Sequence, residues 1–151
     1  ELIKNKFTGK IFWDLGRLKH LQSLQIAHNL LGSGETDDLS FVTSLVNCSN
    51  LRRLSIGFNY FGGVLPKAIA NLSTELLWLS LQNNRISGTI PAGIGQLCSL
   101  VQLDMGNNQL SGIVPSDVGK LHKLEELDFS LNMFTGTVPE SLGNLSKLST
   151  R

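Results

Sequence analysis

Leu100-Val-Gln-Leu-Asp-Met-Gly-Asn-Asn108 and Leu124-Glu-Glu-Leu-Asp-Phe-Ser-Leu-Asn132 share one frame, L-x-x-L-x-φ-x-x-N, in which φ is an apolar residue. The same frame recurs at residues 21–29, 51–59 and 76–84. Counted from an asparagine near the N-terminus, the marker positions are Asn5, Asn29, Asn59, Asn84, Asn108 and Asn132. Their spacings are 24, 30, 25, 24 and 24 residues. A period of this size indicates a repeat protein.

A second motif follows most of the marker asparagines. It reads φ-(S/T/G)-G-x-φ-P and occurs as Phe61-Gly-Gly-Val-Leu-Pro66, Ile86-Ser-Gly-Thr-Ile-Pro91, Leu110-Ser-Gly-Ile-Val-Pro115 and Phe134-Thr-Gly-Thr-Val-Pro139. The first copy is imperfect, with Phe12 where the proline would stand. Frame and tail together predict a single array over residues 1–151, with about six repeats and partial repeats at both ends.

Alternation within the frame predicts a half-buried strand in each repeat, because successive side chains of a strand point to opposite faces. One such strand cannot bury its own apolar face, so the copies are expected to stack into a parallel sheet over a continuous core. The expected core positions are Leu54, Ile56, Leu79, Leu81, Leu103, Met105, Leu127 and Phe129.

The marker asparagines predict a structural ladder. A side-chain amide both donates and accepts, so a stack of asparagines can satisfy backbone groups that each turn would bury unpaired. The predicted ladder is Asn29, Asn59, Asn84, Asn108 and Asn132.

Composition excludes several classes of function. Thirteen basic and twelve acidic residues leave a charge of +1, which implies neither nucleic acid nor an acidic membrane surface as partner. No stretch approaches about 18 consecutive apolar residues, so membrane attachment would need a segment absent from this chain. The histidines are isolated, and Gly93-Ile-Gly95-Gln-Leu-Cys98 only approaches a phosphate-binding loop. We expect no enzyme activity, metal or cofactor in this chain.

The repeat resembles the leucine-rich repeats of plant receptor-like kinases, whose 24-residue unit carries the same L-S/T-G-x-I/V-P tail. Three stretches resemble their immune-receptor subfamily: Asp38-Leu-Ser-Phe-Val-Thr-Ser-Leu-Val-Asn-Cys48, Gly62-Gly-Val-Leu-Pro66 and Ile69-Ala-Asn-Leu-Ser-Thr74. The implied fold is an α/β repeat solenoid, a right-handed superhelix with a parallel β-sheet on its concave face. In such a fold the tails form a second, shorter set of extended segments.

The resemblance also implies a function. The chain would be an extracellular ligand-recognition segment of a plant receptor-like serine/threonine kinase that perceives a peptide or protein in innate immunity. It would reach the extracellular side of the plasma membrane by the secretory pathway, with a co-receptor kinase as partner and its own kinase domain beyond Arg151. The alternative is a soluble extracellular repeat protein, either an inhibitor of cell-wall-degrading enzymes or a structural scaffold.

Two places depart from the period. Six extra residues separate Asn29 from Asn59, and one extra residue lies at residues 73–75. Within the irregular segment 32–48, apolar residues at helical spacing predict a two-turn helix on the convex side, with Asp37 or Asp38 as its cap. Tolerated loop variation is the simpler interpretation of both insertions.

The two cysteines are not expected to form a disulfide. Cys48 and Cys98 fall about two repeats apart in the stack, roughly 10 Å, which exceeds the separation that a disulfide permits. We expect two buried thiols that act as small apolar groups.

The sheet face that points away from the core is the predicted ligand-binding face. Its candidate residues are Arg53, Phe58, Trp78, Gln82, Gln102, Asp104, Glu126 and Asp128. Trp78 is a large aromatic where water is expected, with Phe58 as an extension of the apolar spot, and such residues anchor many interfaces. Arginine on an early repeat and carboxylates on later ones would orient a bound peptide. The alternative is a solvated, charged face with one exposed tryptophan.

Three sequons predict N-glycosylation and therefore secretion: Asn47-Cys-Ser49, Asn71-Leu-Ser73 and Asn144-Leu-Ser146. Each lies half a repeat away from a marker asparagine, so all three are expected on the convex or lateral side. The alternative is that the motif merely suits a turn at that position.

Overall fold

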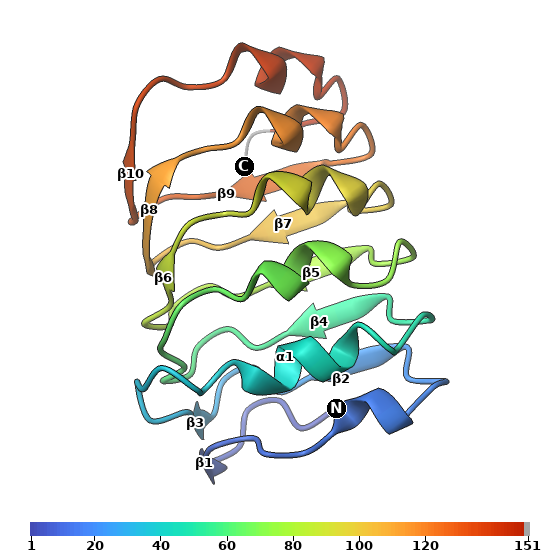
Figure 1. Ribbon diagram of the computed structural model, residues 1–151, viewed down its shortest axis with the longest axis vertical. Coiled ribbons are helices and arrows are strands. Elements are labelled where there is room, and N and C mark those ends of the chain that lie inside the picture. The colour runs from blue at the N-terminus through green and yellow to red at the C-terminus, as the bar shows by residue number, and fades with distance from the viewer. Residues whose placement is uncertain (150–151) are drawn as a thin grey trace.

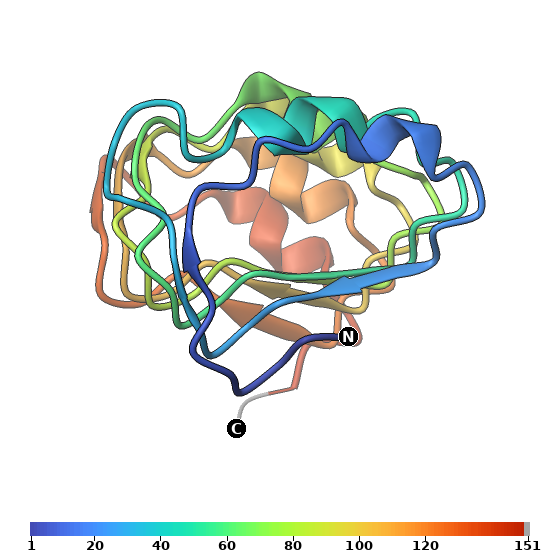
Figure 2. The same ribbon diagram turned by 90° about the horizontal axis from the view of Figure 1, so that it is seen from below.

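The computed structural model describes residues 1–149, in which the repeats stack as the rungs of a solenoid (Figure 1). Seen along the stack, each rung passes through three sides: a concave sheet, a lateral edge and a convex layer of short helices (Figure 2). One turn of the chain per rung explains why a single frame recurs along the sequence.

The concave side is a parallel sheet in the order β2-β4-β5-β7-β9. Its strands are β2 (Ser23–Gln25), β4 (Arg53–Ser55), β5 (Trp78–Ser80), β7 (Gln102–Asp104) and β9 (Glu126–Asp128). The central leucines of neighbouring strands are paired throughout: Leu24, Leu54, Leu79, Leu103 and Leu127. The predicted parallel stack is confirmed.

The tails form the lateral edge, as the resemblance implied. There β1 (Thr8–Gly9) pairs with β3 (Leu30–Leu31), and a separate sheet has the order β10-β8-β6. The strands of the second sheet are β6 (Ser87–Gly88), β8 (Gln109–Ile113) and β10 (Met133–Thr135). A single parallel bridge between Val64 and Ser87 connects β6 to the tail of the irregular rung, residues 61–66. No strand pairing among residues 1–149 joins the two sheets, so the lateral edge is interrupted between β3 and that tail.

Short helices cover the convex side. One is an α-helix, α1 (Ser40–Leu45), and the others are 3₁₀-helices, labelled η: η1 (Leu15–Arg17), η2 (Lys67–Asn71), η3 (Ala92–Gln96), η4 (Ser116–Lys120) and η5 (Glu140–Asn144). A proline immediately precedes each of η2 to η5, with φ between −69° and −62°. Because proline fixes φ near this value, the recurring proline at the end of the tail motif sets where each of these helices begins.

The core lies between the sheet and the convex helices. Six of the eight expected positions are at most 1% exposed: Leu54, Ile56, Leu79, Leu81, Leu103 and Met105. Leu127 and Phe129 pack against the same core but are only half-buried. They belong to the rung of β9, which within residues 1–149 has a neighbouring concave strand on one side only.

The marker asparagines join consecutive rungs through both ends of their amides. The Nδ2 of Asn108 donates to the carbonyl of Met105 in its own rung (3.2 Å) and of Leu81 in the preceding one (3.0 Å). Its Oδ1 accepts from the backbone N–H of Ile86 at 3.0 Å. Asn59, Asn84 and Asn132 repeat this pattern. The side chain thus replaces backbone pairing where each strand ends.

The residue before each ladder asparagine adopts a left-handed conformation that the sequence did not predict. His28, Phe58, Asn83, Asn107 and Leu131 have φ between 51° and 55°. Asparagine tolerates this region better than bulky side chains do. Phe58 and Leu131 are therefore the strained members of the series.

The irregular segment forms a helix on the convex side, as expected, but the predicted cap is wrong. The residue before α1 is Leu39, and no side chain caps the helix. Asp38 is instead 1% exposed and accepts bonds from the backbone N–H groups of Ser33, Gly34 and Gly62. The carboxylate thus joins the preceding loop, through Ser33 and Gly34, to the following tail at Gly62.

The cysteine prediction is half wrong. Both thiols are free, and Cys48 is buried with its Sγ 3.3 Å from the carbonyl of Leu15. Cys98, however, is exposed in the turn after η3, where Leu97 and Leu100 take the inward positions.

Candidate ligand-binding face

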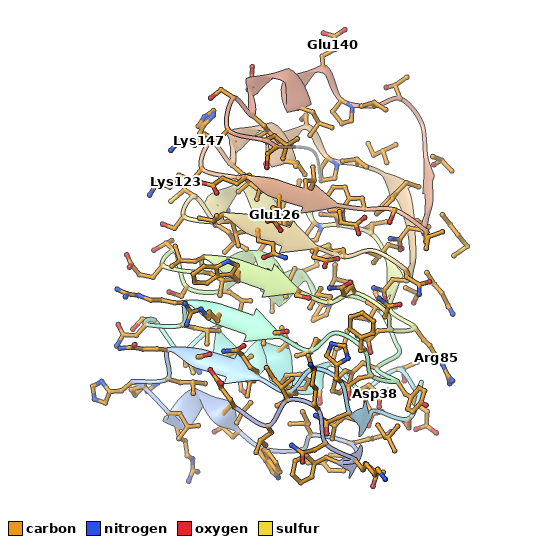
Figure 3. All side chains as sticks on the ribbon, turned by 180° about the vertical axis from the view of Figure 1, so that it is seen from behind. Asp38, Arg85, Lys123, Glu126, Glu140 and Lys147 are labelled. Atoms are coloured by element: carbon orange, nitrogen blue, oxygen red, sulfur yellow. The ribbon has the colours of Figure 1, made fainter. Side chains whose placement is uncertain are left out.

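The parallel register arranges the concave side chains in two columns across the sheet. The first column contains Ser23, Arg53, Trp78, Gln102 and Glu126, and the second contains Gln25, Ser55, Ser80, Asp104 and Asp128. Most of the predicted ligand-binding residues are therefore brought together on one face, which looks toward the viewer in Figure 3 with Glu126 labelled. Small and polar residues dominate the second column.

Arg53 and Trp78 are neighbours in the first column and form a cation–π pair. The guanidinium carbon of Arg53 lies 4.2 Å from the centre of the Trp78 ring. Such a contact holds both side chains in place and leaves the indole half-buried. The pair lines a shallow hollow of about 350 Å³ with Gln25, Ser55, Ser80, Gln82 and Gln102.

An acidic hollow of about 580 Å³ adjoins the first one. It is lined by Gln82, Gln102, Leu103, Asp104, Glu126, Leu127, Asp128, Leu148 and Ser149. Because Gln82 and Gln102 line both hollows, the two form one continuous depression across the sheet.

Asp104 differs from the sequence prediction of a solvated side chain, because it is only 7% exposed. Burial, helped by the charges of Asp128 and Glu126 and opposed by the bond from the Gly106 N–H, raises the pKa of its carboxyl group to about 6. Alternation along a strand predicts which face a side chain points to, but it does not predict how much of that side chain the neighbouring rungs bury. Ala27, Gly57 and Gly106, two positions before their ladder asparagines, are buried for the same reason.

Phe58 does not extend the apolar spot around Trp78. Its ring stacks on His28 with centroids 4.1 Å apart. Its backbone N–H pairs with Gln82, beyond the C-terminal end of β5, whereas Trp78 begins that strand. The two aromatic residues therefore lie near opposite ends of the strands.

The three sequon asparagines occupy equivalent places on the convex side. Asn71 and Asn144 are the last residues of η2 and η5, and Asn47 lies two residues after α1. All three are exposed.

Within residues 1–149, no group of three or more His, Cys, Asp or Glu side chains is placed to hold a metal ion. None of the helices in this part of the chain has the length and apolarity needed to cross a membrane.

The stacked rungs, the asparagine ladder and the concave sheet define a leucine-rich-repeat protein. Family models for the leucine-rich repeat match residues 49–110 and 123–145, together more than half of the chain, so the chain belongs to the leucine-rich-repeat family.

Its relatives include plant receptor kinases. It is 46% identical over 88 residues to the receptor kinase-like protein Xa21 of Oryza sativa subsp. japonica, and 47% identical over 87 residues to the LRR receptor-like serine/threonine-protein kinase EFR of Arabidopsis thaliana. Each match covers 58% of this chain and 8% of the relative. The Arabidopsis receptor kinase HAESA, solved with the peptide hormone IDA and the co-receptor SERK1, superimposes with a TM-score of 0.87 at 34% identity, over 98% of this chain and 24% of that one.

Two features of the surface escaped the sequence prediction. The Arg53–Trp78 pair is one, although both residues precede their ladder asparagines by six positions and the register could have placed them together. The other is a polar hollow beside the irregular loop on the lateral edge. Its signal in the sequence is Gly62, which stands where the other tails have Ser87, Ser111 and Thr135.

Proposed function

We propose that this chain is a ligand-recognition segment from the extracellular part of a plant receptor-like serine/threonine kinase, and that it binds a peptide or protein on its concave face. The observation that carries the proposal is the continuous depression from Arg53 and Trp78 to Asp104 and Asp128. It crosses the rungs from β4 to β9, roughly 14 Å at the usual strand spacing, which matches about four extended residues.

Charge gives the ligand a direction. The depression begins at the arginine of β4 and ends among the carboxylates of β7 and β9. Complementary charges fix register and orientation more than they add affinity. An acidic residue of the ligand therefore lies near Arg53, and a basic residue lies near Asp128.

The relatives support the wider role. The solved HAESA complex contains a peptide hormone and a co-receptor, which supports the same two kinds of partner for the parent of this chain. The likeness to Xa21 and EFR supports a membrane receptor kinase on the extracellular side of the plasma membrane, with a role in innate immunity. A full-length transcript that encodes a membrane span and a kinase domain after these repeats is the expected result. A stop codon without either segment would instead favour a soluble repeat protein.

Peptide selection on the immobilised chain tests the binding face. Peptides that bind the chain are selected from a displayed random library, and those that also bind a Trp78→Ala, Asp128→Lys double variant are removed. Recovered peptides are expected to carry an acidic residue about four positions from a basic one. Trp78→Ala alone is expected to weaken their binding at least tenfold, about 1.4 kcal/mol, because it removes an anchor and frees Arg53.

Trp13 provides the matched control. It is 63% exposed and precedes η1, outside the concave sheet. Trp13→Ala should leave binding unchanged while testing the general effect of losing a tryptophan. Selected peptides that bind equally well to the parent chain, Trp78→Ala and Asp128→Lys would refute the concave site.

Glycosylation tests the secretory part of the proposal. Asn47, Asn71 and Asn144 are exposed at the ends of the convex helices, away from the concave face. Protein expressed in plant cells is expected to carry sugar at these asparagines, detected by mass spectrometry after glycosidase treatment in oxygen-18-labelled water. Three unmodified sites would contradict the prediction.

A further inference from the structure

The irregular loop, residues 32–38, packs against the backbone of Gly62, at the tail position where other rungs carry a serine or threonine side chain. A Cβ atom at Gly62 would lie 2.4 Å from the backbone of Gly34, and one at Gly63 would lie 2.6 Å from the carbonyl oxygen of Thr36. Gly62 is therefore required by the six-residue insertion in the rung before it, whereas Gly63, with φ 80°, matches the left-handed glycine of the other tails. At this point the lateral edge is interrupted between β3 and the tail, which is bridged to β6 through Val64 and Ser87.

Two anchors make the loop a fixed wall. On its inner side, buried Asp38 binds the loop to Gly62 and to the N–H groups of Ser33 and Gly34. On its outer side, the Nζ of Lys10 donates to Glu35 at 2.6 Å and also pairs with Asp37. A lysine of an earlier rung thus pairs with two of the three carboxylates of the loop.

Arg85 lies beside this loop, and its guanidinium group forms no ion pair within residues 1–149. Its guanidinium carbon lies 5.2 Å from the centre of the Tyr60 ring, and its side chain runs along Gly34. Figure 3 shows Arg85 at the lateral edge, near the level of Asp38.

We propose that the hollow beside this loop is a second binding site, which takes a carboxylate carried by a peptide segment of a partner. The lateral hollow has a volume of about 430 Å³ and is lined by Gly34, Glu35, Thr36, Gly63, Arg85, Ser87 and Gln109. It is separate from the concave depression, with which it shares no lining residue.

The donor set fits a peptide carboxylate better than a phosphate or a sulfate. A guanidinium matches the planar fork of a carboxylate. Glu35 on the same wall opposes a doubly charged anion more strongly than a singly charged one. The exposed amide of Gln109 both donates and accepts, as a peptide backbone requires. The hydroxyl of Ser87 gives its hydrogen to Gly63 and keeps a lone pair for a ligand N–H.

The experiment uses two capped tripeptides that differ by one charge. N-acetyl-Gly-Asp-Gly-amide and its Asn counterpart are titrated into the isotope-labelled chain, and backbone amide shifts are followed by NMR. The Asp peptide is expected to shift the signals of Gly34, Thr36, Gly63 and Ser87 in a saturable way. The Asn peptide should bind at least tenfold more weakly, because it lacks the charge that pairs with Arg85.

Three variants define the site. Arg85→Gln should abolish the shifts, and Arg85→Lys should restore only part of the affinity because an ammonium group does not form the two-pronged contact. Lys123→Gln, which removes the same charge from an exposed lysine, should bind the Asp peptide as the parent does. Gln109→Ala should weaken binding two- to threefold without a change of charge.

Several results would overturn the proposal. Equal binding of the Asp and Asn peptides, or shifts that persist in Arg85→Gln, would show that Arg85 does not recognise a carboxylate. Shifts centred on residues 53–55 and 78–82 would assign the acidic peptide to the concave face. Tighter binding of inorganic phosphate at the same residues would overturn the preference for a single charge.

Discussion

In every rung the backbone polar groups of the turn after the strand need hydrogen-bond partners. The regular rungs, between Asn84 and Asn132, and the irregular rung, between Leu30 and Pro66, provide them differently. In the regular rungs one amide per repeat satisfies the turn, with donor and acceptor bonds copied from rung to rung. The irregular rung keeps that amide at Asn59 and adds contacts made only there, through Asp38 and Lys10. Repetition gives the molecule its shape, whereas the unrepeated contacts create the lateral surface on which this chain differs from an ideal array.

The largest effect is expected in the regular region. Asn108 is 9% exposed and makes four hydrogen bonds with its side chain, which join two rungs. Asn108→Ala leaves their partners buried and unpaired, so we expect a loss of about 3 kcal/mol in the free energy of unfolding. Urea unfolding followed by circular dichroism measures it. Gln109→Ala, at the exposed neighbouring position, is the control and should change stability by less than about 0.5 kcal/mol. Equal effects of the two variants would show that the ladder does not hold the rungs together.

The irregular region should respond more locally. Asp38→Ala removes the acceptor of the loop N–H groups, and we expect about 2 kcal/mol of destabilisation confined to the loop. Hydrogen exchange should speed up at Ser33, Gly34 and Gly62 while the regular rungs stay protected. Unchanged exchange at these three amides would contradict the anchoring role.

Asp38 should also make the loop sensitive to acid. Burial alone would raise the pKa of Asp38, but the bonds from Gly62, Ser33 and Gly34 outweigh it and lower the pKa below the usual value for aspartate. The stabilisation of the loop by ionised Asp38 is therefore present at neutral pH and is lost as the pH falls through the lowered pKa. In Asp38→Asn, loop exchange should depend less on pH in that acidic range.

The sequence predicts what repeats and fails where a contact occurs once. Leu54 and Leu79 could be placed in the core because period and alternation agree at every rung. Asp38 was assigned to a helix cap because it lies just before α1, and only the fold reveals the loop N–H groups above it. Asp104 was expected in solvent because alternation gives direction alone. Burial also depends on the neighbouring rung, where Asp128 lies against Gly106.

The concave face carries the next prediction. Since the pKa of Asp104 is raised to about 6, the folded chain retains a proton that the unfolded chain has released between about pH 4 and 6. Stability should therefore fall as pH rises through this window and level off above it. Asp104→Asn keeps the acceptor for the Gly106 N–H without the charge, so we expect a gain of about 1–2 kcal/mol at pH 7. Urea unfolding of the parent and of Asp104→Asn at pH 5 and pH 7 measures both the pH dependence and the gain. Parallel pH profiles of the two proteins would show that Asp104 does not cause the pH dependence.

The smallest effect is expected from Leu131→Asn, a substitution that would make the rung of β9 resemble the two rungs before it. Leu131 is 75% exposed and has φ 52°, the conformation that Asn83 and Asn107 adopt in the two preceding rungs. There the Nδ2 of Asn107 donates to the Oδ1 of Asn83 at 2.6 Å. Leu131→Asn relieves left-handed strain and offers Asn107 the same bond from the next rung, so we expect a gain of about 0.5–1 kcal/mol in urea unfolding. Leu131→Ala removes the same exposed apolar side chain but keeps the strain, so it should give no gain. An equal gain from alanine would assign the effect to the lost leucine and not to the backbone.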